Sequence, residues 1–329
     1  MVFLLSFQNR EKNINFDIID QKKWRLNTVM NSNLPFTKTD IYFYSGHENE
    51  RCSGWFYKLQ TSDQLPCIIL GHGFSGTKQM QLGAFAEKFV HSGYHALVFD
   101  YRHFGESEGH PRQLLNIKKQ HEDWHSAIQF AKTLDSVDHT KIILWGSSFS
   151  GGHVIEIGAL HPDIAAVISQ VPYTNCIESA MATGFFQNFR LFIASLRDMI
   201  HYLFNWNPFY VRVLGEPGEL AAITAPGEYV NAQKMIPDGY EYDNRVCARI
   251  FLSMPFYNPG LKAKHLMMPL LVQIANFDST IPGNYARKAA KQAKNAQILT
   301  YDYSHFELYN DPAFSIVVDD QIKFLKNSI

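Results

Sequence analysis

Two adjacent serines lie where a β-branched apolar run gives way to a helical pattern, and one of them has the surroundings of an activated nucleophile. The segment reads IILWGSSFSGGHV over residues 142–154. A serine raised on a sharp strand-to-helix turn needs small residues two positions before it and two positions after it. Ser148 has Gly146 and Ser150 there, whereas a tryptophan and a phenylalanine hold those positions around Ser147. The spacing therefore predicts Ser148 as the nucleophile.

A third serine matches the pattern G-x-S-x-G letter for letter, in the segment GESEG at residues 105–109. This segment begins several residues after the preceding strand-like run, and His110-Pro111 follow it in place of a helix start. The two glutamates beside the serine would also oppose the negative charge that develops on an attacking oxygen. We therefore interpret Ser107 as a turn residue.

A nucleophilic serine needs a base that removes its proton, and a carboxylate that orients the base. Among the 14 histidines, His305 follows the last strand-like run and precedes the final helical pattern. That position corresponds to the carboxyl end of a strand, where chemistry collects in open α/β sheets. His72 belongs to a glycine-rich loop and His153 to the helical pattern behind Ser148. The position favours His305 as the base.

The carboxylate is predicted by the same reasoning. Asp278 ends the run that starts at Leu270 and precedes His305 by 27 residues. The resulting order of nucleophile, acid and histidine along the chain is typical of a nucleophile-elbow architecture. Asp302 is a competitor, but it stands three residues from His305 in the same loop. Asp100 also ends a strand-like run, and we expect it to form an ion pair in its own loop.

The oxyanion of an acyl intermediate needs two preorganised N–H donors. The backbone of Phe149, directly after the nucleophile, can supply one of them. The loop GHGFSG at residues 71–76 follows another strand-like run, and its glycines allow the main chain to approach a substrate closely. We predict that the backbone N–H of Phe74 supplies the second donor.

Short apolar runs alternate with helical patterns along most of the chain. Continuous runs rich in valine and isoleucine are typical of parallel strands buried on both faces, whereas the first two runs alternate and indicate an antiparallel hairpin. This alternation predicts an α/β fold, a mainly parallel eight-stranded sheet with helices on both sides. The strand runs are Ile41–Tyr44, Gly54–Leu59, Cys67–Leu70, His95–Asp100, Lys141–Trp145, Ala165–Ser169, Leu270–Ala275 and Gln297–Tyr301. The helical patterns are Gln79–Gly93, Leu114–Leu134, Gly152–Leu160, Asn284–Lys294 and Ala313–Lys326.

The alternation of strand-like runs and helical patterns is interrupted between residues 173 and 262, a segment rich in aromatic residues and methionine. Residues 184–189 and 191–204 have amphipathic helical patterns, and Pro-Gly pairs interrupt the remainder of the segment. We expect a mostly helical cap at 173–262, inserted into a core formed by residues 39–172 and 263–329. Residues 1–38 are expected to form an N-terminal arm. Most aromatic residues of the cap should form a small core of their own, and a minority should line a pocket.

The composition excludes several classes of protein. The chain has 329 residues, 46% of them hydrophobic, and a net charge of −1, so a large core is expected but no electrostatic footprint for nucleic acid. The apolar run Val2–Phe7 is too short for a membrane span or a signal-peptide core. Cys52, Cys67, Cys176 and Cys247 are far apart and lack metal-ligand spacing. We therefore expect a reduced, cytoplasmic protein.

With these residues placed, the sequence resembles the α/β-hydrolase superfamily. The resemblance covers about residues 39–329 and rests on GHGFSGTK, FDYRHFGESEG, LWGSSFSGG, ANFDSTIP and YSHFELY, in the order and approximate spacing of that family. Within the superfamily the chain looks like the serine aminopeptidase-like and X-prolyl-peptidase-like hydrolases. The resemblance implies the α/β-hydrolase fold with a Ser148, Asp278 and His305 triad, and a serine hydrolase that needs no metal or cofactor. Ser150 stands where many members have glycine, a small change.

The main hypothesis is a carboxylic-ester hydrolase that acts on a small acyl substrate through an acyl-enzyme. The aromatic cap suggests an apolar acyl or alcohol group, and the oligomeric state stays open. An aminopeptidase, amidase or thioesterase would use the same triad. An aminopeptidase also needs an acidic group for the substrate amine, for which the cap offers Glu178, Glu216, Glu219 and Glu228.

A third hypothesis is a noncatalytic binding protein, or a protein that uses residues 191–204 on a lipid surface. No member of the predicted triad is missing, which disfavours a protein that has the fold of an enzyme but has lost the activity. Arg190, Arg197 and Asp198 do not form a strongly basic helix face, which disfavours lipid binding.

Overall fold

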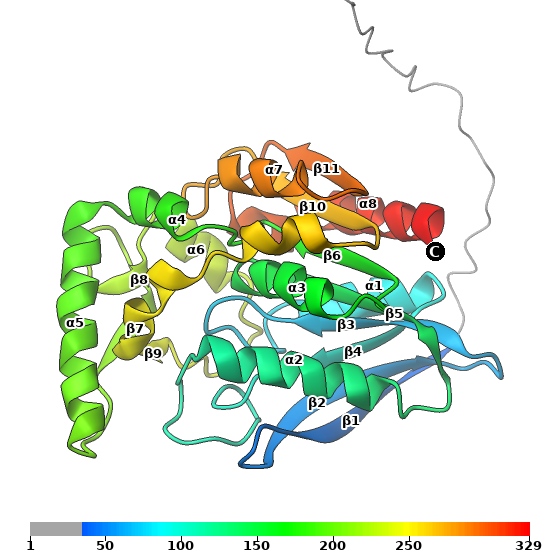
Figure 1. Cartoon of the computed structure of the whole chain (residues 1–329), viewed down its shortest axis with the longest axis horizontal. Helices are drawn as coiled ribbons and strands as arrows, with labels where there is room; N and C mark the ends of the chain where they lie inside the picture. The colour runs from blue at the N-terminus through cyan, green and yellow to red at the C-terminus, as the bar shows by residue number, and fades with distance from the viewer. Residues whose placement is uncertain (1–34) are drawn as a thin grey trace, which may run out of the picture. The chain divides into compact units, whose positions relative to one another are not determined.

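The strand-like runs form one eight-stranded sheet in the computed structural model, which describes residues 35–329 (Figure 1). Its strands are β1 (Phe36–Ser45), β2 (Glu50–Leu59), β3 (Leu65–Gly71), β4 (His95–Phe99), β5 (Val137–Ser147), β6 (Ala166–Gln170), β10 (Leu270–Ala275) and β11 (Ala296–Tyr301). Their order across the sheet is β1-β2-β4-β3-β5-β6-β10-β11. β2 pairs antiparallel with β1 and β4, and every other pairing in this sheet is parallel. The predicted mainly parallel eight-stranded sheet is confirmed.

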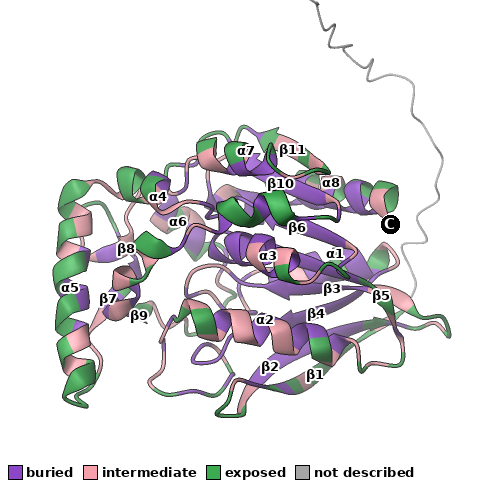
Figure 2. Ribbon diagram, in the orientation of Figure 1, coloured by how far each residue is buried: buried purple, intermediate pink, exposed green. Residues whose placement is uncertain are grey.

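Helices cover both faces of this sheet, as predicted. They are α1 (Leu82–His91), α2 (Ile117–Ala131), α3 (Phe149–Leu160), α7 (Asn284–Ala290) and α8 (Ala313–Ser328). In Figure 1, α2 and α3 lie in front of the sheet, and α1 and α8 lie behind it, in contact with each other. The sheet is therefore the middle of three layers, which explains why its central strands are buried throughout (Figure 2).

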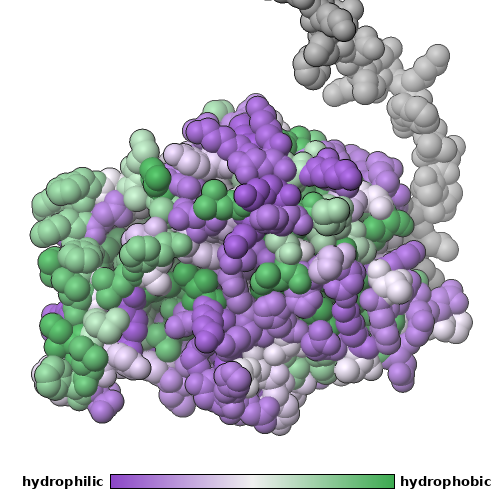
Figure 3. All heavy atoms as spheres, viewed as in Figure 1, coloured by the Kyte–Doolittle hydropathy of each residue, from purple (hydrophilic) through white to green (hydrophobic). Residues whose placement is uncertain are grey.

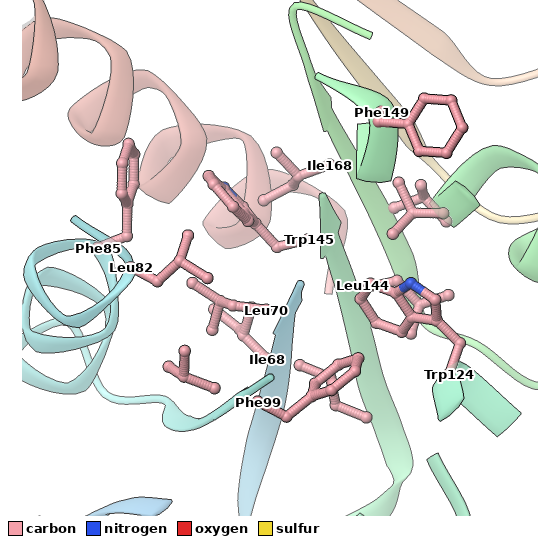
Figure 4. Packing of buried hydrophobic residues seen from close by; sticks show 14 of the residues in the cluster. Ile68, Leu70, Leu82, Phe85, Phe99, Trp124, Leu144, Trp145, Phe149 and Ile168 are labelled. Atoms are coloured by element: carbon pink, nitrogen blue, oxygen red, sulfur yellow. The ribbon is translucent and has the colours of Figure 1, made fainter. Parts of the chain in front are cut away.

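Successive side chains of β5 point to opposite faces of the sheet and pack into the apolar layer on each face (Figure 4). Trp145 points toward α1, where its ring lies 4.8 Å from that of Phe85. The neighbouring Leu144 points to the opposite face, toward Trp124 of α2. All four side chains are completely buried. Because large apolar groups pack on both faces, the backbone that carries the turn after β5 is held rigidly.

An insertion between β6 and β10 forms the cap. It contains α4 (Cys176–Thr183), α5 (Phe185–Leu203), β7 (Tyr210–Leu214), β8 (Ala221–Ile223), α6 (Glu228–Gln233), β9 (Arg245–Cys247) and the 3-10 helices η1 (Ala248–Leu252), η2 (Met254–Phe256) and η3 (Pro259–His265). The two helical patterns predicted at 184–189 and 191–204 form the single long helix α5. A three-stranded sheet, β8-β7-β9, was not predicted, because two of its strands have only three residues each.

The predicted N-terminal arm, residues 1–38, lies largely outside the described residues. Within residues 35–329, none of the helices combines the length and the apolar character needed to pass through a bilayer.

Candidate active site

The turn between β5 and α3 places Ser148 in a backbone conformation that side chains rarely adopt. Its φ is 57° and its ψ is −120°. Such a conformation costs on the order of 1–3 kcal/mol in a residue with a side chain, and strain of this kind gathers at functional sites. The bend needs a glycine at position 146, because an added Cβ would lie 2.2 Å from the carbonyl oxygen of Ser150. The predicted elbow is therefore formed, with Ser148 at its apex.

The other two candidate serines have structural hydrogen bonds. The Ser147 hydroxyl lies in a buried network with Tyr309 and Gln170. The Ser107 hydroxyl accepts a hydrogen bond from the Ser53 amide at 2.8 Å and donates one to the carbonyl oxygen of Asp100 at 2.7 Å. Both arrangements agree with the interpretation that neither serine is the nucleophile.

Ser148, His305 and Asp278 form one hydrogen-bonded chain. The Nε2 atom of His305 lies 3.1 Å from the Ser148 hydroxyl oxygen, and its Nδ1 atom lies 2.6 Å from Oδ2 of Asp278. The other oxygen of Asp278 accepts the amides of Thr280 and Ile281, at 2.9 and 2.7 Å. All three members of the chain are buried. The structure brings these predicted residues together in the order that proton transfer from the serine requires.

The competing carboxylates lie elsewhere. Asp302 accepts a hydrogen bond from the side chain of Asn276 at 2.7 Å and is exposed. Asp100 is buried and forms an ion pair with Lys78, whose ammonium lies 2.8 Å away in the loop after β3. The ion pair predicted within its own loop is not formed, because Arg102 pairs with Asp123 instead. Neither Asp302 nor Asp100 is hydrogen-bonded to His305.

Glu228, considered from the sequence only as a ligand for a substrate amine, contacts the histidine loop from the cap. This residue lies in α6 and is almost completely buried. Its two carboxylate oxygens accept the backbone amides of His305 and Phe306, at 3.0 and 3.3 Å. The residue type and position could not reveal this contact, because an acidic residue in a loop-rich segment is exposed by default. A carboxylate of the cap therefore holds the loop that carries the histidine.

Two carboxylates act on the ionisation of His305. Burial alone would lower the pKa of this imidazole, but the adjacent charge and hydrogen bond of Asp278, together with the charge of Glu228, raise it above its usual range. A base with a raised pKa accepts the serine proton more strongly, and it must be neutral before it can do so.

We expect Glu228→Gln to lower kcat/KM about tenfold, since one buried amide of the histidine loop then faces an NH2 group instead of an acceptor. Removing the negative charge should also lower the pKa of His305, so that the acidic limb of the pH profile moves to lower pH. Glu178→Gln is the matched control: Glu178 is a second buried carboxylate of the cap, and it accepts the amides of Asn284 and Tyr285 instead. An unmoved acidic limb in Glu228→Gln would show that Glu228 has no electrostatic effect on His305.

The loop after β3 lies against Ser148. A Cβ added to Gly73 would lie 3.0 Å from Cβ of Ser148, so the main chain passes as close as it can. The rings of Phe74 and Phe149 meet edge to face, with 5.6 Å between their centres. Within residues 35–329, neither of their backbone N–H groups donates to another protein group. These are the two N–H groups that were predicted from the sequence to bind the oxyanion.

Ser148 opens into a cavity of about 850 Å³ between the sheet and the cap. Its walls come mainly from α4, α5, β8, η1 and η2, and they are apolar, with several hydroxyl groups and one amide. Side chains that reach it include Phe74, Leu191, Phe192, Phe251 and Ile281. None of the lining residues in the described part of the chain carries a charge. The cavity can hold a neutral, apolar group of a molecule whose polar end lies at Ser148.

The four acidic residues considered as amine ligands lie outside this cavity. Glu178 and Glu228 are buried, and backbone amides occupy their carboxylate oxygens. Glu216 is exposed, and the half-buried Glu219 pairs with Arg212 at 2.9 Å. None of the four lines the cavity at Ser148, so none of them is placed to bind a substrate amine there. Within residues 35–329, no cluster of three or more histidine, cysteine or acidic side chains has the arrangement of a metal site.

Comparisons with known proteins agree with this geometry. A protein family described as "alpha/beta hydrolase fold" matches residues 66–197. The quorum-quenching protein AidA of Acinetobacter baumannii is 40% identical over 298 residues, which cover 91% of this chain and 97% of that protein. A thiohydrolase of Eupenicillium brefeldianum is 27% identical over 286 residues, 83% of this chain and 89% of that protein.

Solved structures show the same fold. The structure of DcsB in complex with a substrate analogue superposes with a TM-score of 0.77 and covers 90% of this chain and 100% of that chain, at 21% identity. Est1E of Butyrivibrio proteoclasticus with bound ferulic acid has a TM-score of 0.61 at 18% identity and covers 87% of this chain and 98% of that one. At these identities the likeness concerns the fold alone.

Proposed function

Since this chain belongs to the α/β-hydrolase fold family, we propose that it is a serine hydrolase that cleaves carboxylic esters with a small apolar acyl group. The observation that carries this proposal is the uncharged apolar cavity that ends at the hydrogen-bonded Ser148. We apply the resemblance to the serine aminopeptidase-like group to the fold and not to the substrate, because the described lining of the cavity contains no acidic side chain that could pair with an α-amine.

The proposed reaction follows from the hydrogen-bonded chain. The Ser148 oxygen attacks the ester carbonyl while Nε2 of His305 takes the serine proton, and Asp278 stabilises the imidazolium. The backbone N–H groups of Phe74 and Phe149 hold the negative oxygen. His305 then gives its proton to the leaving alcohol, which departs and leaves an acyl-enzyme. Water attacks the acyl-enzyme with His305 again as the base, which releases the acid and restores Ser148.

A thioester is the second candidate substrate. Thiohydrolases are among the relatives of this chain. The same triad and oxyanion donors cleave a thioester, and a thiolate leaves more readily than an alcohol. The similarity to a quorum-quenching protein adds a third possibility within the ester class, a small quorum-sensing signal that carries an acyl chain. In each case the acyl chain would occupy the apolar cavity.

A panel of substrates tests these proposals. We expect turnover of p-nitrophenyl esters to rise with acyl length until the chain fills the cavity. Each buried CH2 contributes about 0.8 kcal/mol, roughly a fourfold gain in kcat/KM if the cavity realises it fully. The corresponding thioesters should follow the same order. Amino-acyl anilides should be cleaved at least about a hundredfold more slowly, because a charged amine in an apolar cavity loses its hydration without gaining a partner. A preference for the free amine would overturn the ester assignment in favour of a peptidase.

A further inference from the structure

The helix α5 presents an apolar surface to solvent on the side opposite the one that packs on the cap. Its buried residues are Leu191, Ala194, Ser195 and Asp198. Eight of its phenylalanine, isoleucine and leucine side chains are each at least 40% exposed: Phe185, Phe186, Phe189, Phe192, Ile193, Leu196, Ile200 and Leu203. At 3.6 residues per turn these eight fall in one sector roughly 120° wide. Figure 3 shows the apolar surface as a green column at the left edge, over α5. We call these eight side chains the α5 face.

An exposed apolar surface of this extent marks an interaction site. The α5 face continues onto α4, where Met181 is 76% exposed, and past the end of α5 to Phe204 and Trp206, which are 64% and 58% exposed. No charged side chain interrupts the sector itself. A surface of this kind gains free energy of burial when it is removed from water, whatever covers it.

The charged residues of α4 and α5 indicate which kind of partner the α5 face would bind. The only acidic residues of α4 and α5 are Glu178 and Asp198, and both are buried. Asp198 pairs with Arg249 at 2.8 Å inside the cap, so it does not offset the basic residues of the helix. By the same helical geometry, Arg190 and Arg197 lie along one margin of the apolar sector. Arg197 is exposed, and Arg190 is half-buried and donates a hydrogen bond to the carbonyl oxygen of Gly218 at 2.8 Å. The exposed part of the helix is therefore apolar with a basic margin, which is the arrangement of helices that lie in the surface of an anionic membrane.

The burial of Asp198 also removes one objection to lipid binding that the sequence raised. An exposed Asp198 would reduce the positive charge of the helix surface and so oppose binding to an anionic lipid surface. Because the carboxylate is completely buried and also accepts the amides of Phe209 and Arg249, its charge is neutralised within the protein.

The α5 face is also continuous with the mouth of the cavity. Phe185 and Phe192 belong to the face and line the cavity that ends at Ser148. Ile177 and Met181 of α4 also line the cavity, and both are exposed. A second copy of the chain paired antiparallel through this face would bring the basic margins of two such helices together, with no exposed carboxylate on either helix to compensate. A lipid surface would instead supply apolar substrates directly to the opening.

We propose that the α5 face docks the protein on the surface of an anionic phospholipid membrane, with the apolar side chains in the boundary between headgroups and acyl chains. The part of this argument that concerns substrate entry rests on the proposed ester hydrolysis; the docking itself does not. Docking leaves the sheet and the triad outside the membrane, because the apolar sector lies on the outer surface of the cap.

Co-sedimentation with vesicles of mixed phosphatidylcholine and phosphatidylglycerol tests the proposal. The full chain should pellet with these vesicles, less with vesicles of phosphatidylcholine alone and less at high salt. The double variant Phe189→Glu/Ile200→Glu places two charges in the middle of the α5 face, at residues that do not line the cavity. We expect its bound fraction to fall about tenfold or more, because binding scales with buried apolar area. The matched control is Tyr44→Glu/Ile316→Glu, which changes two comparably exposed side chains on β1 and α8 and should pellet like the unmodified chain.

Two results would overturn the proposal: a chain that stays in the supernatant with every vesicle, or a Phe189→Glu/Ile200→Glu variant that binds as well as the control. A concentration-dependent dimer in sedimentation velocity, split by the same variant and without vesicle binding, would assign the face to a second copy and would also reject membrane docking. Turnover of a soluble short-chain ester, measured on each protein, separates this outcome from a failure of the proposed function. We expect that turnover to be the same in all three proteins.

Discussion

Ser148→Ala is expected to lower kcat/KM for a short acyl ester by about 10⁴-fold or more, since a serine hydrolase without its nucleophile keeps only binding and the oxyanion donors. The variant should fold normally. Alanine removes one hydroxyl, and the strained turn at φ 57° is already held by the packing of β5 and α3. The measurement is steady-state turnover together with the thermal unfolding of both proteins.

Labelling with a fluorophosphonate gives the same test without a known substrate. The unmodified chain should carry the adduct on the peptide that contains Ser148, and Ser148→Ala should carry none. The control is Ser107→Ala, because Ser107 has the G-x-S-x-G surroundings but both of its hydrogen bonds are structural. This variant should still be labelled, although its stability should fall by about 1–3 kcal/mol through the lost buried hydrogen bonds. Label on the peptide of Ser107 would contradict the assignment.

The sheet could be predicted because its strands are buried on both faces. Continuous aliphatic runs such as Ile68–Leu70 are typical of parallel strands buried on both faces, so such strands can be recognised from the sequence pattern alone. The elbow could be predicted for a similar reason. Steric crowding at the turn dictates glycine at position 146, where a Cβ would collide with the backbone.

The cap could not be predicted to the same depth, because its elements depend on contacts across the chain. β7 has the alternating sequence YVRVL, but its partners β8 and β9 are too short to leave a pattern. Nothing near Glu228 or Asp198 in the sequence distinguishes a buried carboxylate from a solvated one. Their roles come from the amides and the guanidinium that surround them, and these lie between 11 and 78 residues away along the chain.

Asp278→Asn is the second variant with a large expected effect, and the structure predicts its cause. The oxygen Oδ1 of Asp278 is fixed by the amides of Thr280 and Ile281. In the variant these two donors should hold the carboxamide oxygen in the same place, so that the NH2 group points at Nδ1 of His305. Nδ1 must then accept, and the proton of the neutral imidazole moves to Nε2, the atom that faces Ser148. Histidine in this tautomer cannot take the serine proton, and we expect kcat to fall about 10⁴-fold.

The pH profile of the same variant provides an independent readout. In the unmodified chain, kcat/KM should rise with pH through the raised pKa of His305, because only the neutral imidazole is a base. Removing the charge of Asp278 leaves the burial of His305 in place, and burial lowers its pKa. The acidic limb of the residual activity should therefore move to lower pH while the plateau falls. Asp302→Asn is the control, since Asp302 is exposed and bonded to Asn276, and its profile should match that of the unmodified chain. A loss of activity in Asp302→Asn with an active Asp278→Asn would reassign the acid of the triad.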